Sequence, residues 1–167
     1  MFHTDILRRA ELINHTLATR KQMIVTAESC TGGLIAGALT DVPGSSDAVY
    51  GGFITYANGA KEEMIGVSAP LIEAHGAVSE QVARAMAEGA LKTAGVAIAI
   101  AVTGIAGPGG GTEGKPVGLV HFACATSEGT TTAVERFGDI GRQAVREATV
   151  IRALELVIEH LGVPAPN

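Results

Sequence analysis

The sequence has few aromatic residues, no tryptophan and only two cysteines. Aromatic side chains make up 4% of the 167 residues and hydrophobic side chains 47%, so the core must be largely aliphatic. Cys30 and Cys124 are too few for the disulfide framework that holds many small secreted domains together. Residues 1–9 are polar and lack the charged and then apolar order of a secretion signal. We therefore expect a cytoplasmic protein.

Positive charge and long hydrophobic runs are also scarce. The 12 Lys and Arg residues are scattered among 17 Asp and Glu residues, which leaves a formal net charge of -5 and no basic patch for a phosphate backbone. The longest apolar run, residues 96–102, is far shorter than the roughly 20 residues that a membrane-spanning helix needs. Neither His-Glu-x-x-His nor Cys-x-x-Cys spacing occurs. We expect a soluble protein with no nucleic-acid partner, no membrane partner, no metal and no cofactor.

Helix and strand signals alternate along most of the chain. Apolar residues at three- and four-residue steps predict helices over residues 5–19, 34–40 and 142–160, and further helices start near Asn58, Ser68 and Ser79. Thr4 and Asn58 are candidate helix caps. Apolar runs predict strands over residues 23–27, 48–56, 96–103, 117–126 and 130–137, the last two as a hairpin. This order predicts one domain over residues 1–167, an α/β sandwich with a mixed, mostly parallel sheet and helices on both faces.

Ser29 stands where the first predicted strand turns into a helix. Its hydroxyl is expected to be exposed there, while the backbone amides of the next four residues point at an adjacent oxyanion. These residues are Cys30, Thr31, Gly32 and Gly33. The position suits a nucleophile, but capping of the following helix by Ser29 or Thr31 explains the same residues. Local geometry alone leaves both interpretations open.

Lys61 is a candidate general base. It lies three residues after the candidate cap Asn58, in a first helical turn where the helix dipole disfavours a cation and so favours the neutral amine. Glu62 and Glu63 oppose this shift of the pKa. A serine–lysine pair is an accepted way to activate a hydroxyl nucleophile, and the histidines lie outside these turns. A solvated side chain is the alternative for Lys61, and a core residue at a strand end is the alternative for Tyr56.

A glycine-rich segment, residues 103–111, leaves the predicted central strand at its carboxyl end. Ligands bind at such ends in α/β folds, and bare backbone can approach a phosphate or ribose. Gly109, Gly111 and Gly114 nearly match a dinucleotide pattern, and Lys115 nearly completes a P-loop, but the following residues look like a strand rather than a helix. A flexible loop is the alternative. Arg142, four residues before Arg146 on the last predicted helix, is a weaker candidate for a phosphate contact, or else part of a solvated face.

Three stretches together carry a specific resemblance. They are Thr26-Ala27-Glu28-Ser29-Cys30-Thr31-Gly32-Gly33, then Gly52-Phe53-Ile54-Thr55-Tyr56-Ala57-Asn58 with Lys61, and then residues 103–111 with Lys115-Pro116-Val117-Gly118. The chain resembles the C-terminal domain family of the competence/damage-inducible protein CinA. The similarity extends from the first helix to the last and covers residues 39–46 and 76–79 as well. Gly59 departs from it, since a larger residue is expected beside Asn58.

The resemblance implies hydrolysis of the carboxamide of nicotinamide mononucleotide, which gives nicotinate mononucleotide and ammonia. It implies that Ser29 is the nucleophile, that Lys61 takes its proton and that Tyr56 supplies an assisting hydroxyl. It also implies a homo-oligomer. The residues expected to bind the nucleotide substrate are Cys30, Thr31, Gly32, Gly33, Thr103, Gly104, Gly107, Gly109 and Arg142. Longer family members carry an additional N-terminal domain, and because this chain starts at its first helix we expect none of that domain's activity.

Two other functions fit the same residues. In a non-catalytic nucleotide-binding or interaction module, Ser29 only caps a helix and the glycine-rich segment holds a phosphate without reaction. In an amidase for another small carboxamide, Ser29 and Lys61 keep their roles and only the ligand of the glycine-rich segment differs. Loss of turnover in variants of Ser29 and Lys61 separates the first alternative from an enzyme, and substrate profiling separates the second.

Overall fold

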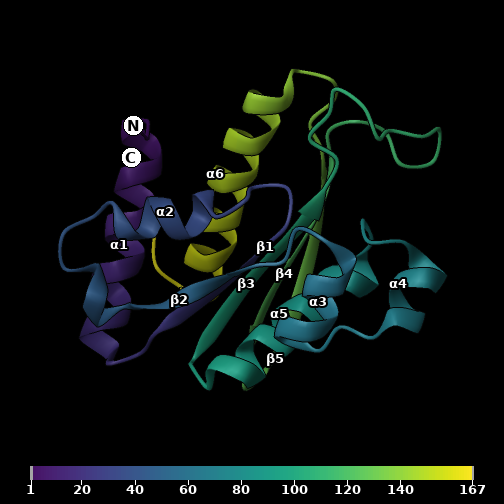
Figure 1. Cartoon of the computed structure of the whole chain (residues 1–167). Coiled ribbons are helices and arrows are strands. Elements are labelled where there is room, and N and C mark those ends of the chain that lie inside the picture. The colour runs from purple at the N-terminus through teal and green to yellow at the C-terminus, as the bar shows by residue number, and fades with distance from the viewer. Residues whose placement is uncertain (1, 167) are drawn as a thin grey trace.

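The computed structural model describes residues 2–166 and is built around a five-stranded sheet (Figure 1). The strands are β1 (Ile24–Glu28), β2 (Val49–Ile54), β3 (Ile98–Gly104), β4 (Leu119–Thr126) and β5 (Gly129–Arg136). Their order is β2-β1-β3-β4-β5, with parallel pairing from β2 to β3 and antiparallel pairing from β3 to β5. Since β4 alone runs against the others, the predicted mixed and mostly parallel sheet is confirmed.

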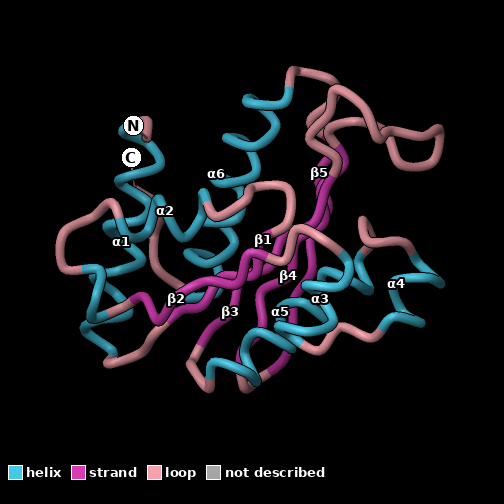
Figure 2. The backbone as a smooth tube through the Cα atoms, viewed as in Figure 1, coloured by secondary structure: helices cyan, strands magenta, loops and turns pink. Residues whose placement is uncertain are grey.

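Helices cover both faces of this sheet, as predicted (Figure 2). One face carries α1 (Thr4–Arg20), α2 (Leu34–Thr40) and α6 (Arg142–Leu161). The other carries α3 (Asn58–Ile65), α4 (Ala69–His75) and α5 (Glu80–Ala94), and a short 3-10 helix spans Ser45–Asp47. Among residues 2–166, no helix is both long enough and apolar enough to cross a membrane.

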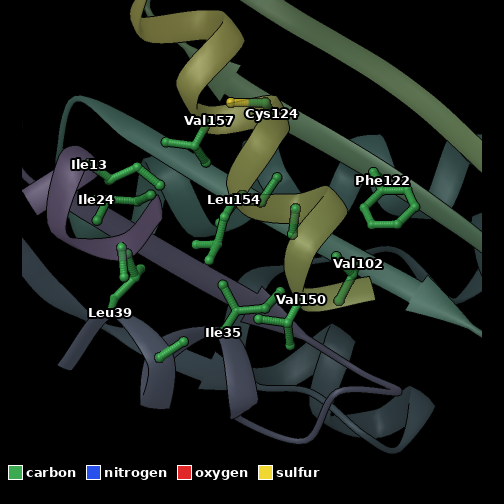
Figure 3. Packing of buried hydrophobic residues seen from close by; sticks show 14 of the residues in the cluster. Ile13, Ile24, Ile35, Leu39, Val102, Phe122, Cys124, Val150, Leu154 and Val157 are labelled. Carbon is green, nitrogen blue, oxygen red and sulfur yellow. The ribbon is translucent and has the colours of Figure 1, made fainter. Parts of the chain in front are cut away.

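The hydrophobic core lies in two layers because the central strands are buried on both faces. Alternate residues of β1 and β3 point to opposite sides, so that Ile24 and Val102 pack in the layer of α1, α2 and α6 while Val25 and Ala99 pack in the layer of α5. Figure 3 shows the first layer, in which Leu154 of α6 lies among side chains of α1, α2 and the sheet. The candidate site begins at the carboxyl ends of β1 and β3, which are paired side by side.

Two of the predicted caps are wrong. Thr4 and Asn58 are themselves the first residues of α1 and α3, and the residue before each makes no side-chain cap. Ser68 and Ser79, by contrast, each accept a hydrogen bond from the amide three residues further on. Tyr56 lies beyond the end of β2 rather than inside the predicted strand, because the chain leaves the sheet after Ile54.

Candidate active site

A cleft of about 260 Å³ opens at the carboxyl ends of β1 and β3, beside the start of α6. The residues that line it are Ser29, Cys30, Tyr56, Gly104, Ile105, Ala106, Gly107, Gly109, Gly110 and Arg142. This volume is just below the roughly 300–1,000 Å³ of typical ligand pockets. A larger hollow of about 660 Å³ lies between α1 and residues 42–44, but its described lining holds neither a serine nor a lysine.

Ser29 is placed in this cleft by the sheet and by a tight turn. Its amide donates a hydrogen bond to the Val102 carbonyl at 3.1 Å, which extends the pairing of β1 with β3 by one residue. Its carbonyl then accepts a hydrogen bond from the Gly32 amide at 3.0 Å, which closes the turn. Gly33 follows with a φ of 99°, a conformation that favours glycine, and precedes the first residue of α2. The predicted strand–turn–helix junction at Ser29 is therefore present.

The amides after Ser29 are arranged differently from the expectation. Gly32 donates its amide to the Ser29 carbonyl, and Gly33 donates its amide to the Glu28 carboxylate at 3.2 Å. Those two N–H groups are already committed, so the prediction that they stabilise an oxyanion is wrong. Among residues 2–166, the amides of Cys30 and Thr31 donate no hydrogen bond to another residue, although the Cys30 amide interacts with its own thiol group, and only Cys30 of these two lines the cleft.

Lys61 reaches Ser29 from the first turns of α3. Its Nζ lies 3.2 Å from Ser29 Oγ, 2.7 Å from the Thr55 carbonyl oxygen and 3.4 Å from the Tyr56 carbonyl oxygen. Only 1% of the residue is exposed, so it is not the solvated side chain of the alternative interpretation. Burial lowers the pKa of Lys61 below its usual 10.5, while a charge on Cys30 acts in the opposite direction. The main cause is thus burial rather than the helix dipole.

The surroundings of Lys61 suit both of its protonation states. A neutral amine has two N–H donors for the two backbone carbonyls and a lone pair that can accept the Ser29 hydroxyl proton. A protonated amine has three donors, and the same two carbonyls and Ser29 Oγ supply three acceptors. Lys61 can therefore take up and release a proton without any rearrangement of its neighbours.

Tyr56 and Arg142 close one side of the cleft. The Tyr56 residue is 58% exposed, and its hydroxyl accepts a hydrogen bond from an Arg142 terminal nitrogen at 3.0 Å. The other terminal nitrogen of Arg142 donates to the Gly107 carbonyl at 3.0 Å. Arg142 thus joins the segment after β2 to the glycine-rich loop, which is the part of the glycine-rich segment 103–111 that follows β3. Arg146, on the same face of α6, does not line the cleft and instead donates to the carbonyls of Cys30 and Thr31.

The glycine-rich loop also lines the cleft, and Gly107 within it and Gly104 just before it leave no room for a side chain. Gly107 has a φ of 80°, and a Cβ there would lie 2.7 Å from Val117 Cγ1. At Gly104, a Cβ would lie 2.6 Å from Val120 Cγ2. Residues 105–118 contain no helix and lead into β4, so neither nucleotide motif has the helix that it requires. The loop places bare backbone against the cleft.

Other predicted site residues lie outside the cleft. The Thr103 hydroxyl donates to the Ala77 carbonyl at 2.8 Å, on the side of the sheet that carries α5. Lys115 donates to the His75 carbonyl at the end of α4. Thr31, Gly32 and Gly33 belong to the turn but do not line the cleft. Ile105, Ala106 and Gly110 do line it and were not singled out, although they lie within the glycine-rich segment.

Cys30 and the histidines are the other residues that could supply a nucleophile or a base. Cys30 is next to Ser29, but burial raises the pKa of its thiol to about 11, so it stays protonated near neutral pH. None of the histidines lines the cleft as the structure describes it. Within residues 2–166, no three His, Cys, Asp or Glu side chains gather in a way that would hold a metal ion.

Comparisons with known proteins agree with this fold. The family described as the CinA C-terminal domain matches residues 7–161. A CinA-like protein of Parasynechococcus marenigrum is 52% identical over 147 residues, which cover 87% of this chain and 35% of that protein. A putative competence-damage inducible protein of Symbiobacterium thermophilum is 50% identical over 171 residues, which cover 96% of this chain and 40% of that protein. The chain therefore spans well under half the length of these curated relatives.

Solved structures with the same fold cover nearly the whole chain. The competence/damage inducible protein CihA from Agrobacterium tumefaciens is 50% identical, with a TM-score of 0.95 and coverage of 98% of this chain and 99% of that one. A competence-damaged protein (CinA) superfamily protein from Escherichia coli is 35% identical, with a TM-score of 0.89 and coverage of 96% and 93%. The architecture described above is thus shared by experimentally solved relatives.

Proposed function

Because the chain belongs to the CinA C-terminal domain family, we propose that it hydrolyses the carboxamide of nicotinamide mononucleotide to nicotinate mononucleotide and ammonia. The observation that carries this proposal is the pair formed by the buried Lys61 and the half-buried Ser29, whose Nζ and Oγ lie 3.2 Å apart beside a cleft that Ser29 lines. A hydroxyl nucleophile with an adjacent base is the arrangement that acyl transfer requires. The choice of substrate rests on the family resemblance. The distance between Ser29 and Lys61 supports the acyl-transfer reaction.

In the first half-reaction, Ser29 Oγ attacks the carboxamide carbon as its proton moves to the lone pair of Lys61 Nζ. Burial favours the neutral amine that this transfer needs. The carbonyl oxygen becomes an oxyanion, which is assigned to the amide of Cys30, the residue after the nucleophile, because Cys30 lines the cleft and its amide donates to no other described residue. Lys61 then returns the proton to the nitrogen as the C–N bond breaks, so ammonia leaves and an ester to Ser29 remains.

In the second half-reaction, water attacks the ester and Lys61 accepts its proton. The tetrahedral intermediate collapses with cleavage of the bond to Ser29 Oγ, which regains its proton from Lys61. The carbonyls of Thr55 and Tyr56 hold the amine throughout, since they can accept from it in either protonation state. The products are the carboxylate and the restored Ser29–Lys61 pair.

The nucleotide part of the substrate is assigned to the glycine-rich loop and Arg142, which line the cleft together with Ser29. The backbone of Gly104, Gly107 and Gly109 lines the cleft without side chains, so a phosphate or ribose can approach it closely. Arg142 uses two of its N–H groups on Tyr56 and Gly107, which leaves further donors of a guanidinium that carries five. Tyr56 holds its hydroxyl beside this cation and is assigned to orient the carboxamide end or assist proton transfer.

The test is ammonia release from nicotinamide mononucleotide by the purified, chelator-treated chain. Ser29→Ala and Lys61→Met should each remove turnover, by about 10²- to 10⁴-fold or more, because the two groups act as a unit. Ser79→Ala, which removes the cap of α5 and a hydrogen bond to the Gly76 carbonyl, is the matched control and should retain full activity.

The outcomes separate the candidate functions. Turnover that is lost in both variants and retained in the control supports the serine–lysine amidase. Turnover of another carboxamide but not of the mononucleotide supports an amidase with a different substrate. No turnover by the parent chain, combined with binding of the nucleotide, would favour the non-catalytic module instead.

A further inference from the structure

Glu28 is a fully buried carboxylate that the proposed reaction does not use. Its Oε2 accepts hydrogen bonds from the Thr31 hydroxyl at 2.6 Å, the Gly33 amide at 3.2 Å and the Ile35 amide at 3.0 Å. Its Oε1 accepts one from the Ala36 amide at 2.8 Å. Helix α2 has no side-chain cap of its own, so this carboxylate takes over the amides of its first turn from the end of β1.

A buried carboxylate is an expensive way to cap a short helix. A serine or threonine at the N-cap satisfies one such amide without removing a charged group from water, as Ser68 and Ser79 do elsewhere in this chain. Glu28 differs from them in its place, because it directly precedes Ser29. Its four bonds tie the far end of the turn that carries the Ser29 hydroxyl, and the first residues of α2, to the residue before Ser29.

Arg146 binds the same turn through the carbonyl groups of the turn, whereas Glu28 binds it through amide and hydroxyl groups. Its Nε donates to the Cys30 carbonyl at 3.1 Å, and a terminal nitrogen donates to the Thr31 carbonyl at 2.9 Å. Each peptide unit is planar, so fixing two successive carbonyls also fixes the direction of the N–H groups that follow them. Glu28 and Arg146 together therefore set the orientation of the peptide planes after Ser29.

Glu28 also connects the nucleophile to its base. Its carbonyl accepts a hydrogen bond from the Thr55 amide at 2.8 Å, and the Thr55 carbonyl accepts one from Lys61 Nζ at 2.7 Å. The side chain of Glu28 thus binds the turn that carries Ser29. Its carbonyl binds Thr55, and the Thr55 carbonyl in turn accepts the hydrogen bond from Lys61. A displacement at Glu28 changes the separation of the two catalytic atoms.

We infer that Glu28 and Arg146 are positioning residues that fix Ser29 Oγ against Lys61 Nζ, Glu28 through the amides of the turn and Arg146 through its carbonyls. This inference rests on the proposed role of Ser29 as nucleophile. Neither side chain lines the cleft, so both act through Ser29 rather than on the substrate. Misplacement of a reacting group by about 1 Å is enough to lower a rate about 10²-fold.

The experiment compares Glu28→Gln, Arg146→Lys and Thr31→Val with the parent chain. Glutamine keeps the shape of Glu28 but turns an amide nitrogen toward donors, lysine replaces the two-pronged contact of Arg146 by a single one, and valine removes one bond to Glu28. Thr16→Val is the matched control, because the Thr16 hydroxyl donates to the Leu12 carbonyl within α1, away from the cleft.

Two readouts are measured on folded protein well below the melting temperature. The first is kcat and KM for ammonia release, and the second is the rate at which a small fluorophosphonate labels Ser29, located by mass spectrometry. We expect Glu28→Gln and Arg146→Lys to lower kcat and the labelling rate together by about 10²-fold with KM little changed, Thr31→Val to lower them less, and the control to change neither.

Unchanged kcat and labelling in folded Glu28→Gln and Arg146→Lys would overturn the inference, as would a rise in KM alone. If Glu28→Gln does not fold, Thr31→Val and Arg146→Lys decide the matter by the same readouts. A parent chain that is labelled at Ser29 but releases no ammonia would overturn the proposed substrate, and the labelling rates would still decide the positioning roles. A parent chain that is neither labelled nor active would overturn both proposals.

Discussion

Replacing Lys61 by methionine should change how the stability of the protein depends on pH. Burial lowers the pKa of Lys61 in the folded protein below its usual 10.5. Between the lowered pKa and 10.5, the unfolded chain therefore binds a proton on Lys61 that the folded chain has released. Stability rises with pH wherever the unfolded state binds more protons, so the parent chain gains stability through this window. Methionine cannot titrate and removes that gain.

Two terms of opposite sign set the size of the effect. In the window, the parent gains up to about 1.4 kcal/mol per pH unit relative to the variant. Independently of pH, methionine leaves the buried Thr55 carbonyl without the hydrogen bond that Lys61 Nζ donates, at a cost of about 1–3 kcal/mol. The free energy of unfolding of the variant, relative to that of the parent, is thus highest at low pH, where the parent carries a buried ammonium. It is lowest above pH 10.5.

Urea denaturation of the parent and of Lys61→Met, from neutral pH to above 10.5, measures this difference. Subtracting the two free energies of unfolding cancels the titration of groups that do not interact with Lys61. The parent's advantage should grow with pH and become constant above 10.5. A difference that is flat or falls across the range would refute the conclusion that Lys61 is buried with a lowered pKa, and with it the basis for its role as a base.

Three further predictions concern the cleft and its support. The kcat/KM for ammonia release should rise with pH to a plateau with an inflection below 10.5, because Lys61 must be neutral to accept the proton; a flat profile or an inflection at 10.5 would contradict its role. Gly107→Ala places a Cβ at positive φ and 2.7 Å from Val117 Cγ1, so it should lower the free energy of unfolding by about 1–3 kcal/mol and raise KM. Gly109→Ala has open space around its Cβ and should leave the free energy of unfolding unchanged. Urea denaturation and steady-state kinetics of both variants measure these effects. Ser79→Ala should lower the free energy of unfolding by about 1–2 kcal/mol in urea denaturation, because it removes a helix cap and a hydrogen bond to the Gly76 carbonyl, with kcat unchanged.

The parts of the site that follow from local order along the chain are predictable from the sequence. A short apolar strand followed by a polar turn and a helix places Ser29 at the carboxyl end of β1, and the same polarity brings residues 55–61 and the glycine-rich loop to the same edge. Parallel strands make this inference possible, because their carboxyl ends share one edge of the sheet. The helix that was expected from Asn58 also begins there, although Asn58 does not cap it.

The residues that hold the site in place are not visible in the sequence. Glu28 reads as one polar residue at a strand end, and nothing in a local window shows that its carboxylate turns back onto amides up to eight residues later. Arg146 is paired with Arg142 by helical spacing, yet the two guanidiniums go to different segments more than 30 and 100 residues away. Such contacts depend on how α6 packs against α2 and the sheet, which periodicity does not determine.

The environment of Lys61 explains how an amine with a high intrinsic pKa can serve as a base in this fold. Its closest acceptors are main-chain carbonyls, which do not titrate, so their support is the same at every pH. The group that opposes the lowering of its pKa is Cys30, and only a thiolate exerts that effect. Burial raises the pKa of Cys30 to about 11, so near neutral pH the thiol is uncharged and the opposition is absent. The burial of Cys30 therefore protects the neutral form of Lys61, and it does so beside the hydroxyl that Lys61 is proposed to activate.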